Sequence, residues 1–197
     1  MPRLSRLHTQ QIDGAACRFR TCYPAQLWPL RLVEARLQGP PFPPGLSPPA
    51  EAAAVIRLLW QTEGDLKFSG LQLDRLRLHL AGSPALNARV YELIFNRALR
   101  VEHRDVASGE VVARLEPEQA LRQVGFEPDE GLLPYPPQAF LGYRLLTELF
   151  AFPAKFNFVD LAGWAAACPK VTGDQVETLI YLDLADADLE RQIDAST

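Results

Sequence analysis

The chain has 197 residues, enough for one domain of generous size, and its 48% apolar and 22% charged residues are ordinary for a globular protein. This composition excludes wholesale disorder, and no stretch approaches the roughly 18 uncharged apolar residues of a membrane span. The net charge of −4 disfavours a nucleic-acid binder, because it gives no general attraction to a polyanion.

Alternation of apolar and polar residues predicts strands in the first part of the chain. Strands are expected at 17–37, broken once at a proline corner, at 55–63 and at 76–82. The segment 38–52 is so rich in proline that it excludes both a helix and a central strand. It is predicted to be a stiff loop.

Two helices are predicted. Ser83 followed by Pro84 gives an N-cap with proline at the first helical position, which predicts a helix over about 84–97. A second helix is expected over about 138–151, with Pro153 ending it. Between them, residues 98–115 are expected to form a hairpin.

Strands are expected again at 156–161 and 176–184, before an acidic tail at 185–197. Strands outnumber helices without regular alternation, which predicts an α+β fold dominated by β structure. We expect an antiparallel sheet or sandwich with the two helices on one side or end. The chain is expected to form a single domain over 1–197.

Possible catalytic groups are few. Glu102, His103 and Asp105 form the only tight cluster of acids and histidine, and a solvated edge strand laced with charge explains them better than a general base. Asp160 among aromatics would be the candidate acid of a glycosidase, but an ion pair with Lys155 or an arginine is the better interpretation.

Metal and cofactor sites are not indicated. Cys17 and Cys22 are expected to point to opposite faces of one strand, and the histidines offer no pair with zinc-ligand spacing. The acids at 127, 129 and 130 lack calcium-loop spacing and are expected to be solvated. With only three cysteines and no secretory signal, the sequence favours free thiols and the cytosol. We expect no cofactor.

Aromatic residues are concentrated between 125 and 161. Those at helix and strand spacing are expected in the core more often than at an interface: Phe140, Tyr143, Phe150, Phe152, Phe156 and Phe158. Tyr135 and Trp164 lie in segments rich in proline or alanine and are predicted to contact a partner. Tyr143 is retained as a third interface candidate.

The same stretch resembles the TssF family, also called ImpG or VasA, of the bacterial type VI secretion system. The resemblance rests on Gly125-Phe126, the acids Asp129 and Glu130, and then LLPYP, GYRLL, FAFP-x-KF and F-V-D-L in order and spacing. Earlier segments agree, so the resemblance covers most of 17–184. One departure is Ala154, where the family often carries an acid, which places an ion pair between that position and Lys155 in doubt.

The resemblance implies an assembly role without catalysis. Family members are longer, so the chain is expected to be a central fragment of a baseplate wedge protein. The implied partners are TssG, a second TssF copy, TssK, TssE and the central spike, with no nucleic acid, membrane insertion or small-molecule substrate. The implied location is the cytoplasm, at the inner face of the cytoplasmic membrane.

Two other classes remain open. A carbohydrate-binding module or glycoside-active enzyme would use Trp28, Trp60 or Trp164 as a stacking platform for sugars. A metal-stabilised module is the third interpretation. A concave aromatic pocket flanked by two carboxylates would support the carbohydrate class, and metal analysis would test the last.

Overall fold

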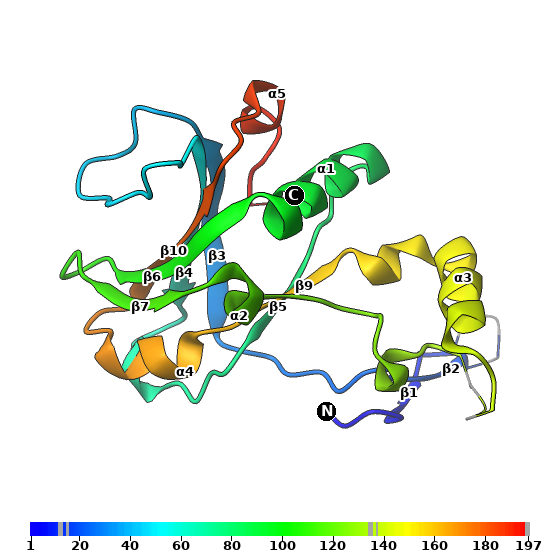
Figure 1. Ribbon diagram of the computed structural model, residues 1–197. Helices are drawn as coiled ribbons and strands as arrows, with labels where there is room; N and C mark the ends of the chain where they lie inside the picture. The colour runs from blue at the N-terminus through cyan, green and yellow to red at the C-terminus, as the bar shows by residue number, and fades with distance from the viewer. Residues whose placement is uncertain (12–13, 15, 134–135, 137, 196–197) are drawn as a thin grey trace. The chain divides into compact units, whose positions relative to one another are not determined.

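The computed structural model describes residues 1–11, 14, 16–133, 136 and 138–195, and the chain divides into two compact units (Figure 1). Unit 1 combines Met1–Trp28 with Val124–Phe156, and unit 2 combines Pro29–Gln123 with Asn157–Thr197. Each unit is therefore assembled from two separate segments of the chain.

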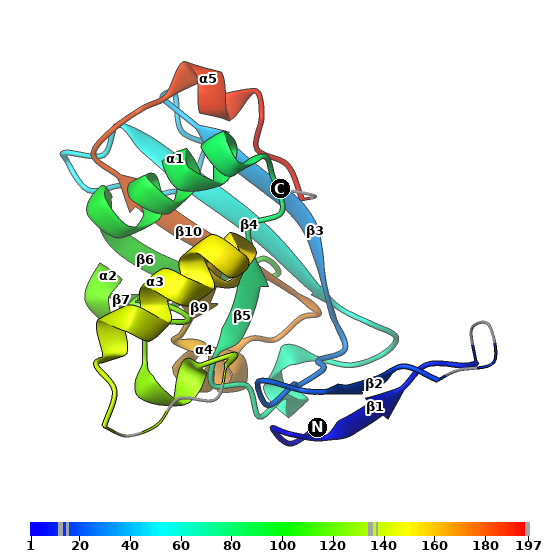
Figure 2. The same ribbon diagram turned by 90° about the vertical axis from the view of Figure 1, so that its right-hand side faces the viewer.

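Unit 2 is built on a five-stranded antiparallel sheet in the order β3-β4-β10-β6-β7 (Figure 2). Its strands are β3 Leu30–Gln38, β4 Ala54–Thr62, β6 Ala98–Asp105, β7 Val111–Leu115 and β10 Gln175–Leu182. The central strand β10 is buried at every position after Gln175. This burial on consecutive positions shows that the strand is covered on both faces.

The proline-rich loop covers one of those faces. Phe42, Leu46 and Ala52 of this loop pack against Val55 of β4 and Tyr181 of β10. The loop is also anchored by Arg100 of β6, whose guanidinium donates a hydrogen bond to the carbonyl oxygen of Ser47. Prolines suit this position because the loop needs no ladder hydrogen bonds.

A second, three-stranded sheet and a helix complete the core of unit 2. The sheet has the order β5-β9-β8, with β5 Leu76–His79, β8 Leu121–Gln123 and β9 Phe158–Leu161. Helix α1, Pro84–Asn96, begins where the Ser83 hydroxyl accepts a hydrogen bond from Leu86 N–H. It buries Val90, Leu93 and Ile94. Short helices are α2 Pro117–Ala120, α4 Trp164–Ala167 and α5 Ala187–Glu190, with 3₁₀ turns at Phe68–Gly70 and Cys168–Lys170.

Unit 1 contains a two-stranded antiparallel ribbon and one longer helix. The ribbon pairs β1 Arg6–His8 with β2 Arg18–Arg20. The helix is α3, Leu141–Ala151, which is preceded by a 3₁₀ turn at Pro128–Glu130 and followed by another at Pro153–Phe156.

The predicted α+β class with antiparallel sheets is confirmed, and the two predicted helices correspond to α1 and α3. Strands β1 and β8 were not predicted, because each has only three residues and therefore no measurable periodicity. The acidic tail contains α5, whose N-terminus is capped by the Asp186 carboxylate and which buries Leu189.

Candidate partner-binding surface

Helix α3 buries its charged residues and exposes its apolar ones, which is the reverse of an ordinary surface helix. Its only two charged residues, Arg144 and Glu148, are 4% and 1% exposed, whereas Tyr143 is 71% and Phe150 83% exposed. A helix on a protein surface ordinarily buries its apolar stripe and exposes its charges. The orientation of α3 is therefore set by polar contacts.

Arg144 binds the loop that precedes the helix. Its guanidinium donates hydrogen bonds to the carbonyl oxygens of Glu127 and Pro128, at 2.8 and 2.9 Å. A Cβ atom at Gly131 would lie only 2.8 Å from the same guanidinium, so this glycine permits the close approach. The buried guanidinium is thus paired with backbone carbonyl oxygens.

Glu148 binds the chain on both sides of the helix. One carboxylate oxygen accepts hydrogen bonds from Leu132 N–H at 2.8 Å and Leu133 N–H at 3.2 Å, and the other accepts one from the Lys155 ammonium. Burial alone would raise the pKa of Glu148, but these hydrogen bonds and the charge of Lys155 outweigh it and lower the pKa. Lys155 thus has an acidic partner, which comes from α3 in place of the family acid at position 154.

Glu130 completes the polar interior of unit 1. Its carboxylate accepts hydrogen bonds from Gly125 N–H at 2.7 Å and Glu127 N–H at 3.2 Å, and its backbone carbonyl accepts one from the Tyr23 hydroxyl at 2.8 Å. Gly125 has a φ of +105°, which a glycine adopts without strain. The prediction that Glu130 is solvated was wrong, because its carboxylate closes this turn.

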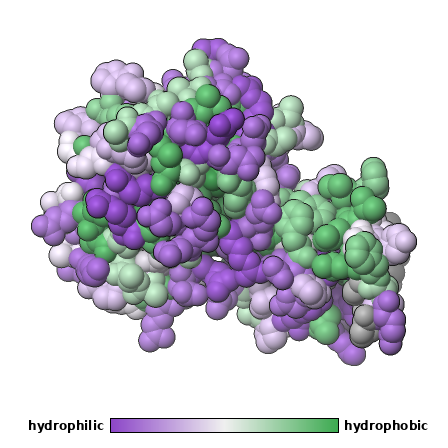
Figure 3. Space-filling view, viewed as in Figure 1, coloured by the Kyte–Doolittle hydropathy of each residue, from purple (hydrophilic) through white to green (hydrophobic). Residues whose placement is uncertain are grey.

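The exposed face of α3 and its flanks forms a continuous apolar set, which we name the α3 surface. It consists of Phe140, Tyr143, Leu146, Leu149, Phe150 and Phe152, all exposed. Hydrophobic residues gather over α3 on the face seen in Figure 3. Tyr143, Leu146 and Phe150 fall at i, i+3 and i+7, the spacing with which a helix presents anchors to an apolar groove.

The prediction of core positions was wrong for Phe140, Tyr143, Phe150 and Phe152, because the buried side of α3 is occupied by Arg144 and Glu148. Phe156 and Phe158 are partly buried. Of the predicted contact residues, Tyr143 lies on the α3 surface, and its role at an interface stays a prediction. Tyr135 lies outside the described residues.

Trp164 is fully buried, so the expectation that it lies outside the core was wrong. Its ring stacks on Phe68 with centroids 5.9 Å apart, meets the edge of Trp60 at 5.9 Å and packs on His103 at 4.3 Å. Trp164 is the first residue of α4, and the residue before it, Gly163, has a positive φ that a glycine adopts without strain. Trp60 and Trp164 therefore offer no stacking platform to a sugar.

The cluster of Glu102, His103 and Asp105 is buried, and its prediction as a solvated edge was wrong. Strand β6 lies between β10 and β7 and has no free edge. Glu102 pairs with Arg100 and Arg114, at 3.0 and 2.7 Å. Asp105 accepts hydrogen bonds from the hydroxyls of Ser108 and Thr172, at 3.0 and 2.7 Å, which hold two turns together.

Asp160 is engaged by an arginine, as expected. The Arg77 guanidinium donates two hydrogen bonds to its two carboxylate oxygens, at 2.7 and 2.8 Å. Both oxygens of the carboxylate are therefore engaged by this bidentate pair. It removes the specific candidate for a glycosidase acid.

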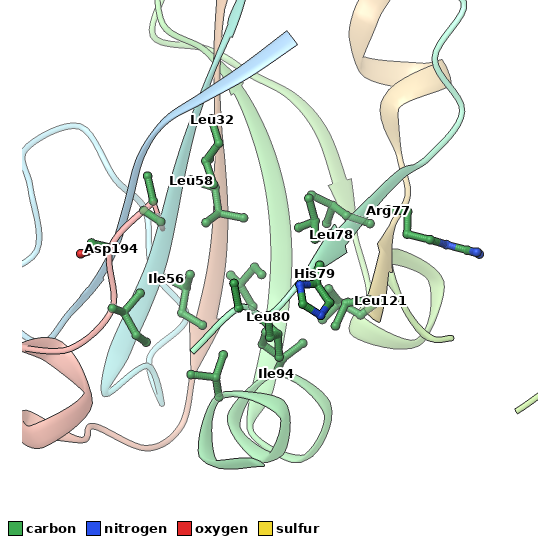
Figure 4. A pocket seen from close by; sticks show the side chains of 18 of the residues that line it. Leu32, Ile56, Leu58, Arg77, Leu78, His79, Leu80, Ile94, Leu121 and Asp194 are labelled. Carbon is green, nitrogen blue, oxygen red and sulfur yellow. The ribbon is translucent and has the colours of Figure 1, made fainter. Parts of the chain in front are cut away.

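Unit 2 also contains an apolar cavity of about 330 Å³. It lies between the five-stranded sheet, the three-stranded sheet and α1, and Leu58, Leu78 and Ile94 are among its lining residues (Figure 4). Figure 4 shows the Arg77 side chain extending away from the cavity. The other charged or imidazole side chains of the lining are His79 and Asp194, and most of the remaining lining is apolar, so few polar groups are available to orient a substrate.

Neither a metal cluster nor a membrane-spanning helix is found in the described part of the chain. Among those residues, no three His, Cys, Asp or Glu side chains come close enough to hold a metal ion. No helix formed by them has the length and apolar character to cross a bilayer. The α3 surface is the candidate functional site because it is apolar, aromatic and exposed.

Sequence reasoning missed Phe140, Leu146 and Leu149 as surface residues. One signal was present: α3 carries a single pair of opposite charges at i, i+4, Arg144 and Glu148, within an otherwise apolar helix. Such a pair marks either the solvent side or a buried ionic contact, and the sequence alone does not distinguish the two.

The chain is similar to known proteins of one family. The family model described as type VI secretion system, TssF, matches residues 1–197. The type VI secretion system component TssF1 of Pseudomonas aeruginosa is 37% identical over 188 residues, which cover 93% of this chain and 30% of that protein. The chain thus spans about a third of the length of this curated relative.

A similar fold occurs in a solved assembly. A chain of the cryo-electron-microscopy structure of the type VI secretion system TssK-TssF-TssG baseplate subcomplex matches with a TM-score of 0.72 and 21% identity. The match covers 94% of this chain and 33% of that chain. At this identity the likeness establishes the fold alone.

Proposed function

The chain belongs to the TssF family of the type VI secretion system, and from that membership we propose that it works as a structural part of the baseplate wedge, by protein–protein assembly. In this proposal the α3 surface is one of the contacts through which the wedge is built. In the same proposal, the protein supports assembly of the sheath and tube and delivery of effectors.

The reversed polarity of α3 is the observation that carries the proposal. Exposed apolar patches on soluble proteins mark contact sites when they are contiguous. The α3 surface is contiguous and rich in aromatic residues, which are enriched at interfaces. Its orientation is held by buried hydrogen bonds of Arg144 and Glu148, so the patch is presented by a preorganised helix.

We propose TssG as the partner of the α3 surface, and TssK and a second TssF copy as further partners of the protein. Support comes from the family membership and from the similar chain, whose structure is a TssK-TssF-TssG subcomplex. TssE and the central spike are proposed as contacts in the full baseplate. We propose a cytoplasmic location at the inner face of the cytoplasmic membrane.

We also propose that the protein acts without catalysis. The residues with catalytic potential are committed to structural bonds: Glu102 to two arginines, Asp160 to Arg77 and Asp105 to two hydroxyl groups. Carboxylate oxygens held in such bonds are not free to contact a substrate.

Co-purification with TssG tests the proposal. Full-length protein carrying Tyr143→Ser, Leu146→Ser and Phe150→Ser is expected to lose TssG, because these side chains are the central anchors of the α3 surface. The matched control is Leu27→Ser, which also removes an exposed apolar side chain, 96% exposed in the free chain. Retention of TssG by the triple variant at the level of the control would contradict the proposal.

A further inference from the structure

The ribbon of unit 1 collects four basic residues on one face. In its register Arg6 lies opposite Arg20 and His8 opposite Arg18, with the pair Leu7 and Phe19 between them. Residues two apart on a strand share a face, and directly opposed residues share it too. Arg6, His8, Arg18 and Arg20 therefore form one set, which we name the cationic face.

These arginines differ from most others in the chain. Arg57, Arg77 and Arg89 each pair with a carboxylate of the chain. Within the residues that the structure describes, no carboxylate lies in ion-pair distance of the cationic face. Like charges that are directly opposed across a ribbon destabilise it, so the cationic face costs the ribbon free energy in the isolated chain.

The ribbon has little burial to offset that cost. All six residues of β1 and β2 are exposed, including the apolar pair Leu7 and Phe19. Besides its ladder, the ribbon is held by hydrogen bonds such as that from Ser5 N–H to the Thr21 hydroxyl at 3.0 Å. A two-stranded ribbon without a covered face is marginal in water. A bound acidic partner would remove both deficits, since it covers the ribbon and neutralises the repulsion.

We propose that the cationic face is a docking site for an acidic segment of a partner protein, separate from the α3 surface. The choice of a protein rests on the proposed function. Alternate residues of a strand lie about 7 Å apart, so the face matches carboxylates at alternate positions of an extended segment. Each guanidinium can take one carboxylate with two hydrogen bonds.

A protein partner fits better than a polyanion or a lipid surface. The chain as a whole carries a net charge of −4, which repels an extended nucleic acid or an anionic bilayer but not a short acidic segment that contacts only the ribbon. The only apolar residues of β1 and β2 are Leu7 and Phe19, which is a small apolar surface for insertion into a bilayer.

Binding of labelled peptides to the whole chain tests the inference. The probe is a peptide of alternating threonine and glutamate, and the control probe replaces each glutamate by glutamine. We expect the glutamate peptide to bind, to weaken as salt rises, and to lose affinity about tenfold or more in the Arg6→Ala/Arg20→Ala variant. That variant removes a repulsive pair, so it should not unfold the ribbon. Arg6→Lys/Arg20→Lys should retain part of the affinity because it keeps the charge.

The matched control is Arg36→Ala/Arg191→Ala, which lowers the net charge equally at exposed sites. Equal losses in both double-alanine variants, or no binding by wild type, would overturn the inference. Stronger binding to a DNA duplex or to vesicles of phosphatidylcholine and phosphatidylglycerol than to the peptide would also overturn it. None of these readouts involves TssG, so failure here is distinct from failure of the α3 proposal.

Discussion

His103 joins three elements of unit 2 through its neutral ring. Its Nε2–H donates to the carbonyl oxygen of Ala162 at 2.8 Å, so Nδ1 accepts from the Thr178 hydroxyl at 3.0 Å. The Thr178 oxygen in turn accepts from the Trp60 indole N–H at 3.1 Å. This series of hydrogen bonds requires a neutral imidazole, because Nδ1 can accept a hydrogen bond only when it carries no proton.

The buried imidazole predicts a loss of stability in mild acid. Burial lowers the pKa of His103 to about 4, against about 6.5 when unfolded, although the hydrogen bond to Ala162 opposes the shift. The unfolded chain therefore binds more protons between these values, and stability falls as pH falls through this window. We expect a loss of about 2 kcal/mol between pH 7 and 5 from this group, measured by urea unfolding.

The control for this prediction is His103→Asn, which cannot titrate in the same range. Its unfolding free energy should be lower at pH 7, since bonds are lost, but should change less between pH 7 and 5. An equal pH dependence in the variant and in wild type would refute the role of His103. Glu148 contributes in a separate window, because its lowered pKa removes stability only as pH falls below its unfolded value.

Lys155 and Glu148 form a buried ion pair in unit 1, each 1% exposed, and the Arg144 guanidinium also lies 3.8 Å from Glu148. Lys155→Met removes the nearer positive charge from a buried carboxylate, so it should destabilise the chain by about 3 kcal/mol, at the low end for a broken buried pair because Arg144 and two backbone N–H donors remain. The double variant Lys155→Met/Glu148→Gln should recover part of that loss, since the glutamine still accepts from Leu132 N–H. Denaturant unfolding measures both, and additive losses would contradict the pairing.

The exposed position of the apolar residues of helix α3 predicts that their substitution has little effect on the free energy of unfolding. Because Leu146 and Phe150 are exposed, Leu146→Ser and Phe150→Ser should each change the free energy of unfolding by only about 0.5 kcal/mol. A core position would lose about 3–5 kcal/mol on such a truncation. Thermal unfolding of the chain distinguishes these cases, and a large loss of stability would indicate that both side chains are buried in the core.

The elements also differ in how far the sequence predicts them. Helix α1 follows from local signals, Ser83 and Pro84, and β10 from the alternation of residues along 176–184. The helical character of α3 is local too, but its buried side is decided by distant groups: the carbonyls before Gly131 and the ammonium of Lys155. A rule that places charges outward fails where such partners exist.

The burial of Glu102, His103 and Asp105 was also decided by distant parts of the chain. The local pattern around His103 resembles an edge strand, but pairing of β6 with β10 comes from a strand more than seventy residues away. Trp164 was misplaced for a similar reason, because its neighbours Phe68 and Trp60 are distant in sequence. The α3 surface was in part predictable through Tyr143, whereas the cationic face needed the register of the ribbon.

At the scale of the whole molecule, we propose that residues 1–197 unfold as one domain. Each unit consists of two segments, and the chain crosses between the units three times, after Trp28, Gln123 and Phe156. Such interleaving couples the units through the chain itself. Tryptophan fluorescence of a Trp28→Phe variant, which keeps only Trp60 and Trp164 of unit 2, and hydrogen exchange of α3 should give the same urea midpoint. Earlier exchange of α3 would indicate separate unfolding.

The central claim is that the α3 surface is covered by another protein in the baseplate. A photo-cross-linking amino acid placed at Phe150 of the full-length protein, with Leu27 as the comparison site, tests it in cells that assemble the secretion system. We expect a cross-link from position 150 to TssG that is absent from position 27. A cross-link from position 150 only within the same chain, or none in the assembled baseplate, would contradict it.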